Sequence, residues 1–301
     1  MPPGILLPMD ERPIGMFDSG LGGLTVARAV ADALPGEDIV YFGDTARCPY
    51  GPRDLAEVRG FVLQIGTWLA ARDVKLIVVA CNTGTAAGLA LAQRVFDVPV
   101  IGVVEPGARA AVKATVNRKV GVIGTVGTIE SEAYPRAVRA IDAGVTVFSM
   151  ATPKFVEAAE AGIRTGIYEV SRSYLDPLRR TGIDTLILGC THFPLIDTAI
   201  RNGIGRGVQL ISSAEEVAAE VVDTLERRGQ LASAGRTGRH RFATTGDPGE
   251  FQRPGGSVFG GSLGHAERVE LAALESLMDE RLRAALVEAA DADAREVAAC
   301  E

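Results

Sequence analysis

The chain has 301 residues, a length that favours two domains or one large one. Hydrophobic residues make up 47% of the chain and charged residues 23%, which excludes a disordered or fibrous architecture for most of it. The 31 Lys and Arg residues against 38 Asp and Glu residues give a net charge of −7, which argues against broad binding to nucleic acids or anionic membranes.

Other simple features of the sequence narrow the class of protein further. No apolar stretch approaches the roughly 18 residues that a membrane span needs, and the N-terminal residues do not resemble a secretory signal. Four cysteines are too few for a disulfide scaffold in a chain of this length, so we expect reduced thiols and a cytoplasmic location. Because no Cys-x-x-Cys or His-x-x-x-His spacing occurs, the sequence predicts no metal site.

Short apolar runs alternate with longer amphipathic ones along the chain. The runs lack strict alternation, as expected when helices cover both faces of a sheet. The pattern predicts an α/β fold with mostly parallel sheets flanked by helices. The predicted strands are Ile14–Phe17, Asp38–Phe42, Lys75–Cys81, Val98–Val103, Val120–Gly124, Val145–Ser149, Thr185–Gly189, Val208–Ile211 and Arg239–Thr244.

Two helix starts carry recognisable signals. Asp54 can cap a helix whose apolar residues recur at three- and four-residue spacing. Ser213 and Glu216 have the spacing of a capping box at the start of a helix over 213–228.

A weak internal repeat divides the chain into two similar parts. The strand at Ile14 resembles the one at Val120, at an offset of 106 residues, and Cys81 corresponds to Cys190 at an offset of 109. Each cysteine follows a strand, and ligands of open α/β sheets bind at such strand ends. We expect two α/β halves that face each other and hold a ligand between two thiols.

We assign approximate boundaries to these parts. Residues 12–104, completed by 212–261, form the first domain, and residues 105–211 form the second, with the active site in the cleft between them. Residues 262–301 are predicted to be an exposed C-terminal helical appendage.

The motif that starts at Asp18 and Ser19 follows a strand and precedes a helix that begins near Thr25. Its three glycines permit a sharp turn, and its hydroxyl and helix N-terminal N–H groups suit an anion. A tight turn without a ligand is the alternative.

A lone cysteine at a strand end is usually a small buried hydrophobic residue. The matched contexts of Cys81 and Cys190 favour a chemical role, since N–H groups at a helix start and the imidazole of His192 can stabilise a thiolate. Cys48 and Cys300 have no counterpart in the repeat. The Pro-containing turn before Tyr50 and Gly51 can line a pocket with Tyr50 and its backbone N–H groups.

Five motifs taken together resemble the glutamate racemases, which belong to the cofactor-independent aspartate/glutamate racemase family. The resemblance extends from about Pro13 to Pro248. The motifs are Asp-Ser-Gly-Leu-Gly-Gly, Gly-Asp-Thr-Ala-Arg-Cys-Pro-Tyr-Gly, Val-Val-Ala-Cys-Asn-Thr, Val-Ile-Gly-Thr and Leu-Gly-Cys-Thr-His-Phe-Pro-Leu.

The resemblance implies interconversion of L- and D-glutamate without a cofactor, to supply D-glutamate for peptidoglycan, by a homodimer of pseudo-symmetric two-domain subunits. It implies that Cys81 and Cys190 are the catalytic acid and base, assisted by Asp18, His192 and Glu160. The substrate-binding residues that it implies are Asp18, Ser19, Tyr50, Gly51, Asn82, Thr83, Thr125, Thr191 and His192.

Three alternatives stay open at this stage. A racemase for aspartate or another acidic amino acid would share the paired thiols. A thiol nucleophile made of Cys190 and His192 could hydrolyse an amide without Cys81. A binding protein could hold an amino acid in the same cleft without exchanging its Cα proton.

Overall fold

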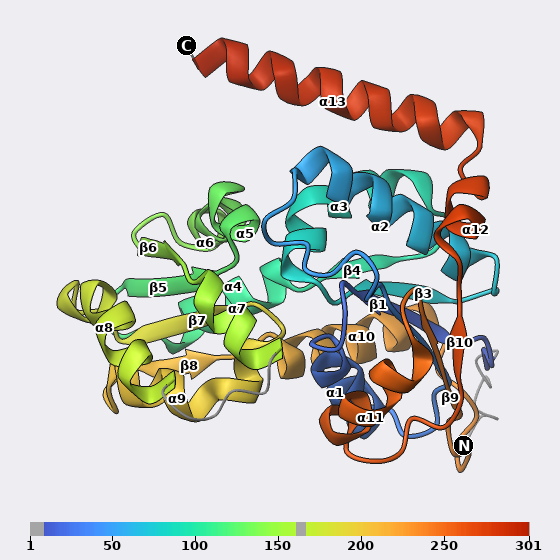
Figure 1. Cartoon of the computed structure of the whole chain (residues 1–301), viewed down its shortest axis with the longest axis horizontal. Coiled ribbons are helices and arrows are strands. Elements are labelled where there is room, and N and C mark those ends of the chain that lie inside the picture. The colour runs from blue at the N-terminus through green and yellow to red at the C-terminus, as the bar shows by residue number, and fades with distance from the viewer. Residues whose placement is uncertain (1–8, 161–166, 301) are drawn as a thin grey trace, which may run out of the picture.

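The structure is a computed structural model that describes residues 9–160 and 167–300. Two parallel sheets lie side by side in it (Figure 1). The strands of the described residues are β1 (Ile14–Asp18), β2 (Ile39–Gly43), β3 (Leu76–Val79), β4 (Val100–Gly102), β5 (Lys119–Gly124), β6 (Thr146–Ala151), β7 (Thr185–Gly189), β8 (Gln209–Ile211), β9 (His240–Thr244) and β10 (Ala266–Arg268). Each predicted strand matches an observed one to within two residues at either end, so the predicted fold class is confirmed.

The two sheets repeat one strand order. In the described residues the first sheet runs β10-β9-β2-β1-β3-β4 and the second runs β6-β5-β7-β8. The order β2-β1-β3-β4 of the first sheet therefore recurs as β6-β5-β7-β8 in the second. The first sheet has β9 and β10 in addition, beside β2. This confirms the internal repeat, because β5 takes the place of β1 and β7 that of β3. The strand order reverses beside β1 and β5, which is where such folds bind ligands.

Helices connect these strands and cover the sheets. They are α1 (Leu24–Ala33), α2 (Leu55–Ala70), α3 (Asn82–Val95), α4 (Val104–Ala114), α5 (Val126–Glu130), α6 (Ala133–Ile141), α7 (Pro153–Glu160), α8 (Ile167–Arg180), the 3₁₀ helix η1 (Phe193–Ile196), α9 (Asp197–Ile204), α10 (Ala214–Arg228), α11 (Pro248–Phe259), α12 (Leu271–Ser276) and α13 (Glu280–Cys300). We call the six-stranded sheet with α1–α3 and α10–α13 the first half, and the four-stranded sheet with α4–α9 the second half.

Each sheet has an apolar layer on both faces. In β1, Ile14 and Met16 pack toward α1 and α10, whereas Phe17 packs toward α2 and α3. In the second half one layer includes Phe193 and residues of α7–α9, and the other joins β5 and β7 to α4 and α6. Burial on both faces explains why these strands are continuous apolar runs.

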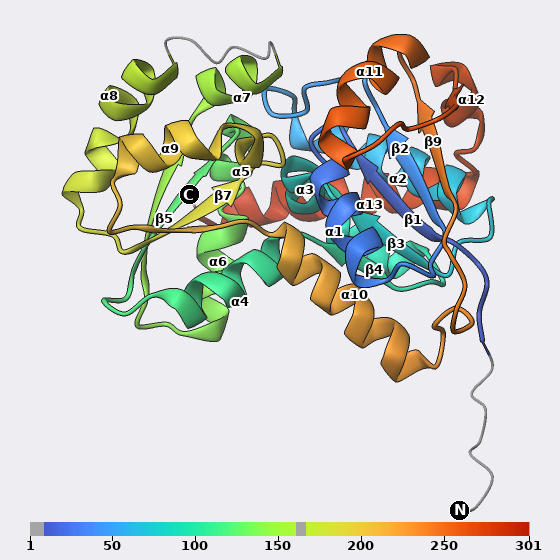
Figure 2. The ribbon, with the colours of Figure 1, turned by 90° about the horizontal axis from the view of Figure 1, so that it is seen from below.

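The chain crosses between the halves twice in the described residues. The first crossing leads from β4 into α4, and the second leads from β8 into α10. Figure 2 shows α4 and α10 together at the junction, with a sheet on either side. The first half is thus built from both ends of the chain, in line with the predicted return of residues 212–261, although the domain boundaries themselves stay predictions.

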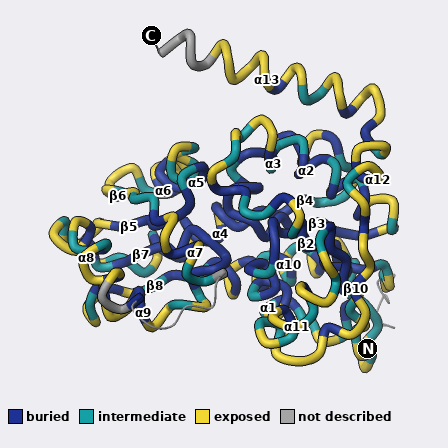
Figure 3. Tube along the Cα trace, in the orientation of Figure 1, coloured by how far each residue is buried: buried dark blue, intermediate teal, exposed yellow. Residues whose placement is uncertain are grey.

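The C-terminal region differs from the expected helical appendage. Residues 266–268 form β10, which pairs with β9, and Val269 and Leu274 join the core of the first half. Only α13 resembles an appendage: it packs against α2 and α3 through Leu282 and Ala289, while much of its length is exposed (Figure 3). None of the described helices is long and apolar enough to cross a membrane.

The two predicted helix starts have different outcomes. The Asp54 carboxylate accepts a hydrogen bond from the Ala56 N–H at 2.7 Å, so this cap is confirmed. The capping box at Ser213 was wrong, because the Ser213 hydroxyl caps no N–H group of α10. It lies 3.4 Å from the Tyr134 hydroxyl instead, in the buried junction between the halves.

Candidate active site

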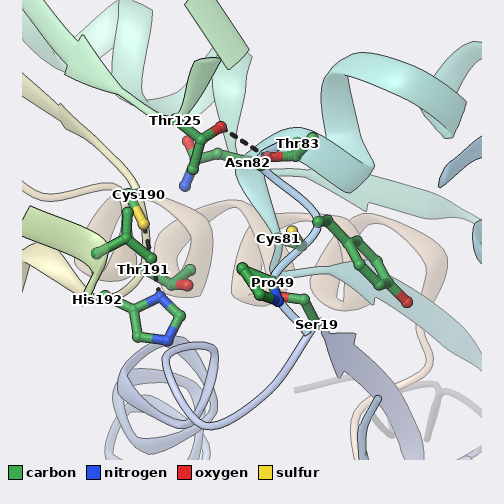
Figure 4. A pocket seen from close by; sticks show the side chains of 12 residues that line it. Ser19, Pro49, Cys81, Asn82, Thr83, Thr125, Cys190, Thr191 and His192 are labelled. Carbon is green, nitrogen blue, oxygen red and sulfur yellow. Dashed lines mark hydrogen bonds between the residues drawn. The ribbon is translucent and has the colours of Figure 1, made fainter. Parts of the chain in front are cut away.

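One cavity between the halves contains both predicted cysteines. The cavity is narrow, with a volume of about 20 Å³ for the centre of a water-sized molecule. Figure 4 shows Cys81 and Cys190 on opposite sides of this space. The residues that line it are Ser19, Pro49, Tyr50, Gly51, Cys81, Asn82, Thr83, Thr125, Val156, Cys190, Thr191 and His192.

Cys81 connects the end of β3 to the first turn of α3. Its side chain is 5% exposed, and its Sγ accepts a hydrogen bond from the Gly84 N–H at 3.4 Å. We expected the surrounding N–H groups to favour the thiolate. The Gly84 and Ser19 N–H groups do so, but burial and the nearby Asp18 carboxylate outweigh them, so the pKa of Cys81 is raised.

Cys190 follows β7 directly, at the matching place in the second sheet. It precedes the 3₁₀ helix η1 and not an α-helix, so the local structure of the repeat is imperfect here. Its Sγ lies 3.5 Å from Nδ1 of His192, and both side chains are 5% exposed. The imidazole is therefore placed to exchange a proton with this thiol or to orient it.

Asp18 lies behind the cavity wall. Its carboxylate is fully buried and accepts the Gly23 N–H at 2.9 Å and the Gly20 N–H at 3.3 Å. The Thr191 hydroxyl lies 3.4 Å from the same carboxylate. Its negative charge contributes to the raised pKa of Cys81, although it is not among the lining residues.

Hydroxyl and amide groups form the polar part of the wall. Thr83 lies in the first turn of α3, Thr125 precedes α5, and their Oγ1 atoms lie 2.9 Å apart across the junction (Figure 4). The Thr125 Oγ1 also accepts the Thr128 N–H at 3.2 Å and so caps α5. Asn82 and Thr191 complete this wall, and all of these groups are neutral at ordinary pH.

Tyr50 and Gly51 line the cavity as predicted, but the tyrosine hydroxyl points elsewhere. It donates a hydrogen bond to the buried carboxylate of Asp44, which also accepts from Nε of Arg47 and from the Thr245 hydroxyl. These bonds fix the turn before Gly51. The O atom of Gly51 accepts the Gly127 N–H at 2.9 Å and ties the turn to the second half.

Two glycines let the halves approach closely around the cavity. A Cβ atom at Gly22 would stand 2.4 Å from Oγ1 of Thr191, and one at Gly51 would stand 2.6 Å from Cβ of Thr125. Atoms essentially never come so close, so only glycine fits at these positions in this arrangement. The absence of two side chains thus permits the contact that brings Cys81 and Cys190 to one cavity.

The comparison with known proteins agrees with this geometry. A match to the Asp/Glu/hydantoin racemase family covers residues 24–221. The chain belongs to this family. It is 48% identical over 242 residues to a glutamate racemase of Corynebacterium diphtheriae, with 80% of this chain and 91% of that protein covered. It is 45% identical to one of Geobacter metallireducens, with 88% and 99% covered.

Solved structures of glutamate racemases have the same fold as this racemase. An isoform from Bacillus anthracis has a TM-score of 0.84 at 43% identity, with 87% of this chain and 98% of that chain covered. An enzyme from Francisella tularensis, in complex with D-glutamate, has a TM-score of 0.82 at 34% identity, with 89% and 100% covered. The chain is therefore an amino-acid racemase.

Some residues of the racemase site were missed or lie outside the described part. Pro49 and Val156 also line the cavity. Pro49 belongs to the Cys-Pro-Tyr-Gly motif, whereas no sequence signal points to Val156. Tyr134, which contacts Asn82, was also missed. The predicted side chain of Glu160 lies outside the described residues, so its role remains a prediction.

Proposed function

We propose that this racemase interconverts L- and D-glutamate by transferring protons between the substrate Cα and two thiols, Cys81 and Cys190. One observation carries the proposal: the two cysteines, each at the end of a strand in a different sheet, line one cavity from opposite sides (Figure 4). Racemisation removes the Cα proton from one face and returns a proton to the other, so groups on both faces avoid any need to turn the substrate.

The proton balance requires one thiolate and one thiol before each turnover. The thiolate takes the Cα proton, and the thiol on the opposite side donates its proton to the planar carbanion. The product has the opposite configuration, and the two sulfur atoms have exchanged protonation states. Restoring the starting state requires proton exchange with water or a turnover in the reverse direction.

Neutral donors would stabilise the carbanion. Negative charge that develops at Cα spreads onto the α-carboxylate, where preorganised hydrogen-bond donors stabilise it most in a buried site. The hydroxyls of Ser19, Thr83 and Thr191 and the amide of Asn82 line the cavity and can supply such donors. They bind the carboxylate without placing a charge of their own beside either thiol.

Asp18 would couple substrate binding to formation of the thiolate. Its carboxylate and the buried position hold the pKa of Cys81 above the ordinary thiol value. A substrate ammonium at the part of the wall in front of Asp18 would offset that negative charge and lower the pKa of Cys81 toward the working range. His192, 3.5 Å from Cys190, would exchange protons with that thiol, and Glu160 is proposed to assist on the same side.

The choice of glutamate rests on the relatives, which carry that name and, in one structure, bind D-glutamate. The test is circular dichroism of L-glutamate incubated with the pure protein and nothing else. The signal should decay to zero as equal amounts of the enantiomers form, and the same assay with L-aspartate should be far slower. Persistence of the L-glutamate signal, or faster loss of the L-aspartate signal, would overturn this proposal.

The biological setting follows from the same family resemblance. We propose that the enzyme works in the cytoplasm as a homodimer and supplies D-glutamate for peptidoglycan synthesis. Analytical ultracentrifugation at micromolar concentration checks the assembly state. A sedimentation coefficient of a monomer at all concentrations would contradict the dimer without affecting the proposed chemistry.

A further inference from the structure

A tyrosine of the second half contacts a cavity residue of the first half. Tyr134 lies on α6, is 1% exposed, and donates a hydrogen bond from its hydroxyl to Oδ1 of Asn82 at 2.7 Å. The Ser213 Oγ lies 3.4 Å from the same hydroxyl. Asn82 directly follows Cys81 and lines the cavity, whereas Tyr134 does not. Tyr134 therefore contacts a cavity residue from behind the cavity wall.

In this structure the bond engages the oxygen end of the Asn82 amide, which leaves the nitrogen end toward the cavity. An asparagine amide has an acceptor oxygen and a donor nitrogen, and its orientation follows from its hydrogen bonds. Because the tyrosine hydroxyl occupies the oxygen, the nitrogen is free to face the cavity. Figure 4 shows this nitrogen directed into the space between Cys190 and Cys81.

The surroundings of Tyr134 leave it little freedom. A Cβ atom at Gly189 would stand 3.2 Å from its ring, and one at Gly107 would stand 3.3 Å from its ring and 2.7 Å from Oγ of Ser213. The ring therefore occupies a tight slot between β7 and α4. Burial raises the pKa of Tyr134, so its hydroxyl keeps its proton and remains a donor.

We propose that Tyr134 is a positioning residue that holds the Asn82 amide so that its N–H groups face the α-carboxylate of the substrate. The orientation exists only while the halves are in contact, because the two residues belong to different halves. Separation of the halves would release the amide, so Tyr134 links presentation of this donor to closure of the cavity. The inference rests on the proposed function, since it assigns a partner to the substrate carboxylate.

The test is a double-mutant cycle on racemisation kinetics with Tyr134→Phe and Asn82→Ser. Tyr134→Phe removes one oxygen and frees the amide to turn, so kcat/KM should fall about tenfold, mostly in kcat, because the donor acts on charge that grows in the transition state. In the Asn82→Ser background the same change should alter kcat/KM by less than about twofold, because the group on which it acts is gone. Exchange of Cα hydrogen for deuterium, followed over hours by NMR, keeps slow variants measurable.

Two controls separate positioning from packing. Tyr174→Phe removes a tyrosine hydroxyl of the same half that lies 3.5 Å from a backbone oxygen of β6 and outside the cavity lining, so its kinetics should match the unmodified chain. Ser213→Ala removes the 3.4 Å contact but leaves the bond to Asn82, and should also change kcat/KM by less than about twofold.

The inference is overturned if Tyr134→Phe retains the unmodified kcat/KM, or if it causes the same tenfold loss in the Asn82→Ser background. The second result would mean that Tyr134 supports the structure generally and not the amide. The unmodified chain is assayed first. Its failure to racemise glutamate would overturn the proposed function, and this assignment with it, before any variant is compared.

Discussion

Gly51 touches Thr125 across the junction of the halves, with no room for a Cβ atom between them. A Cβ at residue 51 would stand 2.6 Å from Cβ and 2.8 Å from Cγ2 of Thr125. We therefore predict that Gly51→Ala pushes the halves apart and lowers kcat/KM for glutamate by about 100-fold, because displacements near 1 Å have such effects on oriented reactants. Steady-state circular dichroism kinetics measure this.

A matched control is Gly60→Ala, in α2 of the same half. A Cβ atom there has no heavy atom within 4 Å, so the change should leave the kinetics intact. It should also raise the free energy of unfolding by about 0.4–1 kcal/mol, as expected for a glycine replaced within a helix. Unimpaired kinetics in Gly51→Ala would show that close approach of the halves is not needed for catalysis.

The raised pKa of Cys81 predicts a specific dependence of stability on pH. A free thiol ionises near pH 8.5, whereas the folded Cys81 thiol keeps its proton to higher pH. Above about pH 8.5 the unfolded chain therefore loses a proton that the folded chain retains, and this contribution to stability falls as pH rises. Between about pH 7 and about pH 10 the loss reaches at most about 2 kcal/mol, since each pKa unit corresponds to 1.36 kcal/mol.

The measurement is the difference in the free energy of unfolding by urea between the unmodified chain and Cys81→Ser. Other titrating groups contribute equally to both proteins and cancel in that difference. As pH rises, the unmodified chain should lose more unfolding free energy than Cys81→Ser. A difference that stays constant over this range would contradict the raised pKa.

The proposed proton transfer needs no metal ion. Dialysis against a chelator should therefore leave kcat/KM within about twofold of the untreated value, because thiols and neutral donors perform each step. Inductively coupled plasma mass spectrometry on the dialysed protein verifies that metals have been removed. Loss of activity that returns on adding a divalent cation would contradict the two-thiol scheme.

The sequence predicted much of the fold because both faces of each sheet are buried. Continuous apolar runs such as Thr185–Gly189 identify strands of this kind without further information. The repeat that pairs Cys81 with Cys190 predicts two similar halves from the sequence alone. The strand β10 could not be found in this way, because its three residues include exposed Glu267 and Arg268 at the sheet edge.

Features of the site that depend on contacts between the halves left no local signal. The Ser213 capping box had the right spacing, yet its hydroxyl lies in the junction beside Tyr134. Tyr134 and Asn82 are 52 residues apart, and no periodicity links them. Gly22 and Gly51 were expected to shape turns, whereas the structure shows that they also make room for threonines of the other half.

The central claim is that each thiol serves one face of the substrate. Its most direct test is exchange of Cα hydrogen in heavy water, measured by NMR for L- and D-glutamate with Cys81→Ala and Cys190→Ala. Neither variant should racemise glutamate, and each should exchange the hydrogen of one enantiomer only, with opposite preferences. Racemisation near the unmodified rate by either variant, or the same preference in both, would contradict the account.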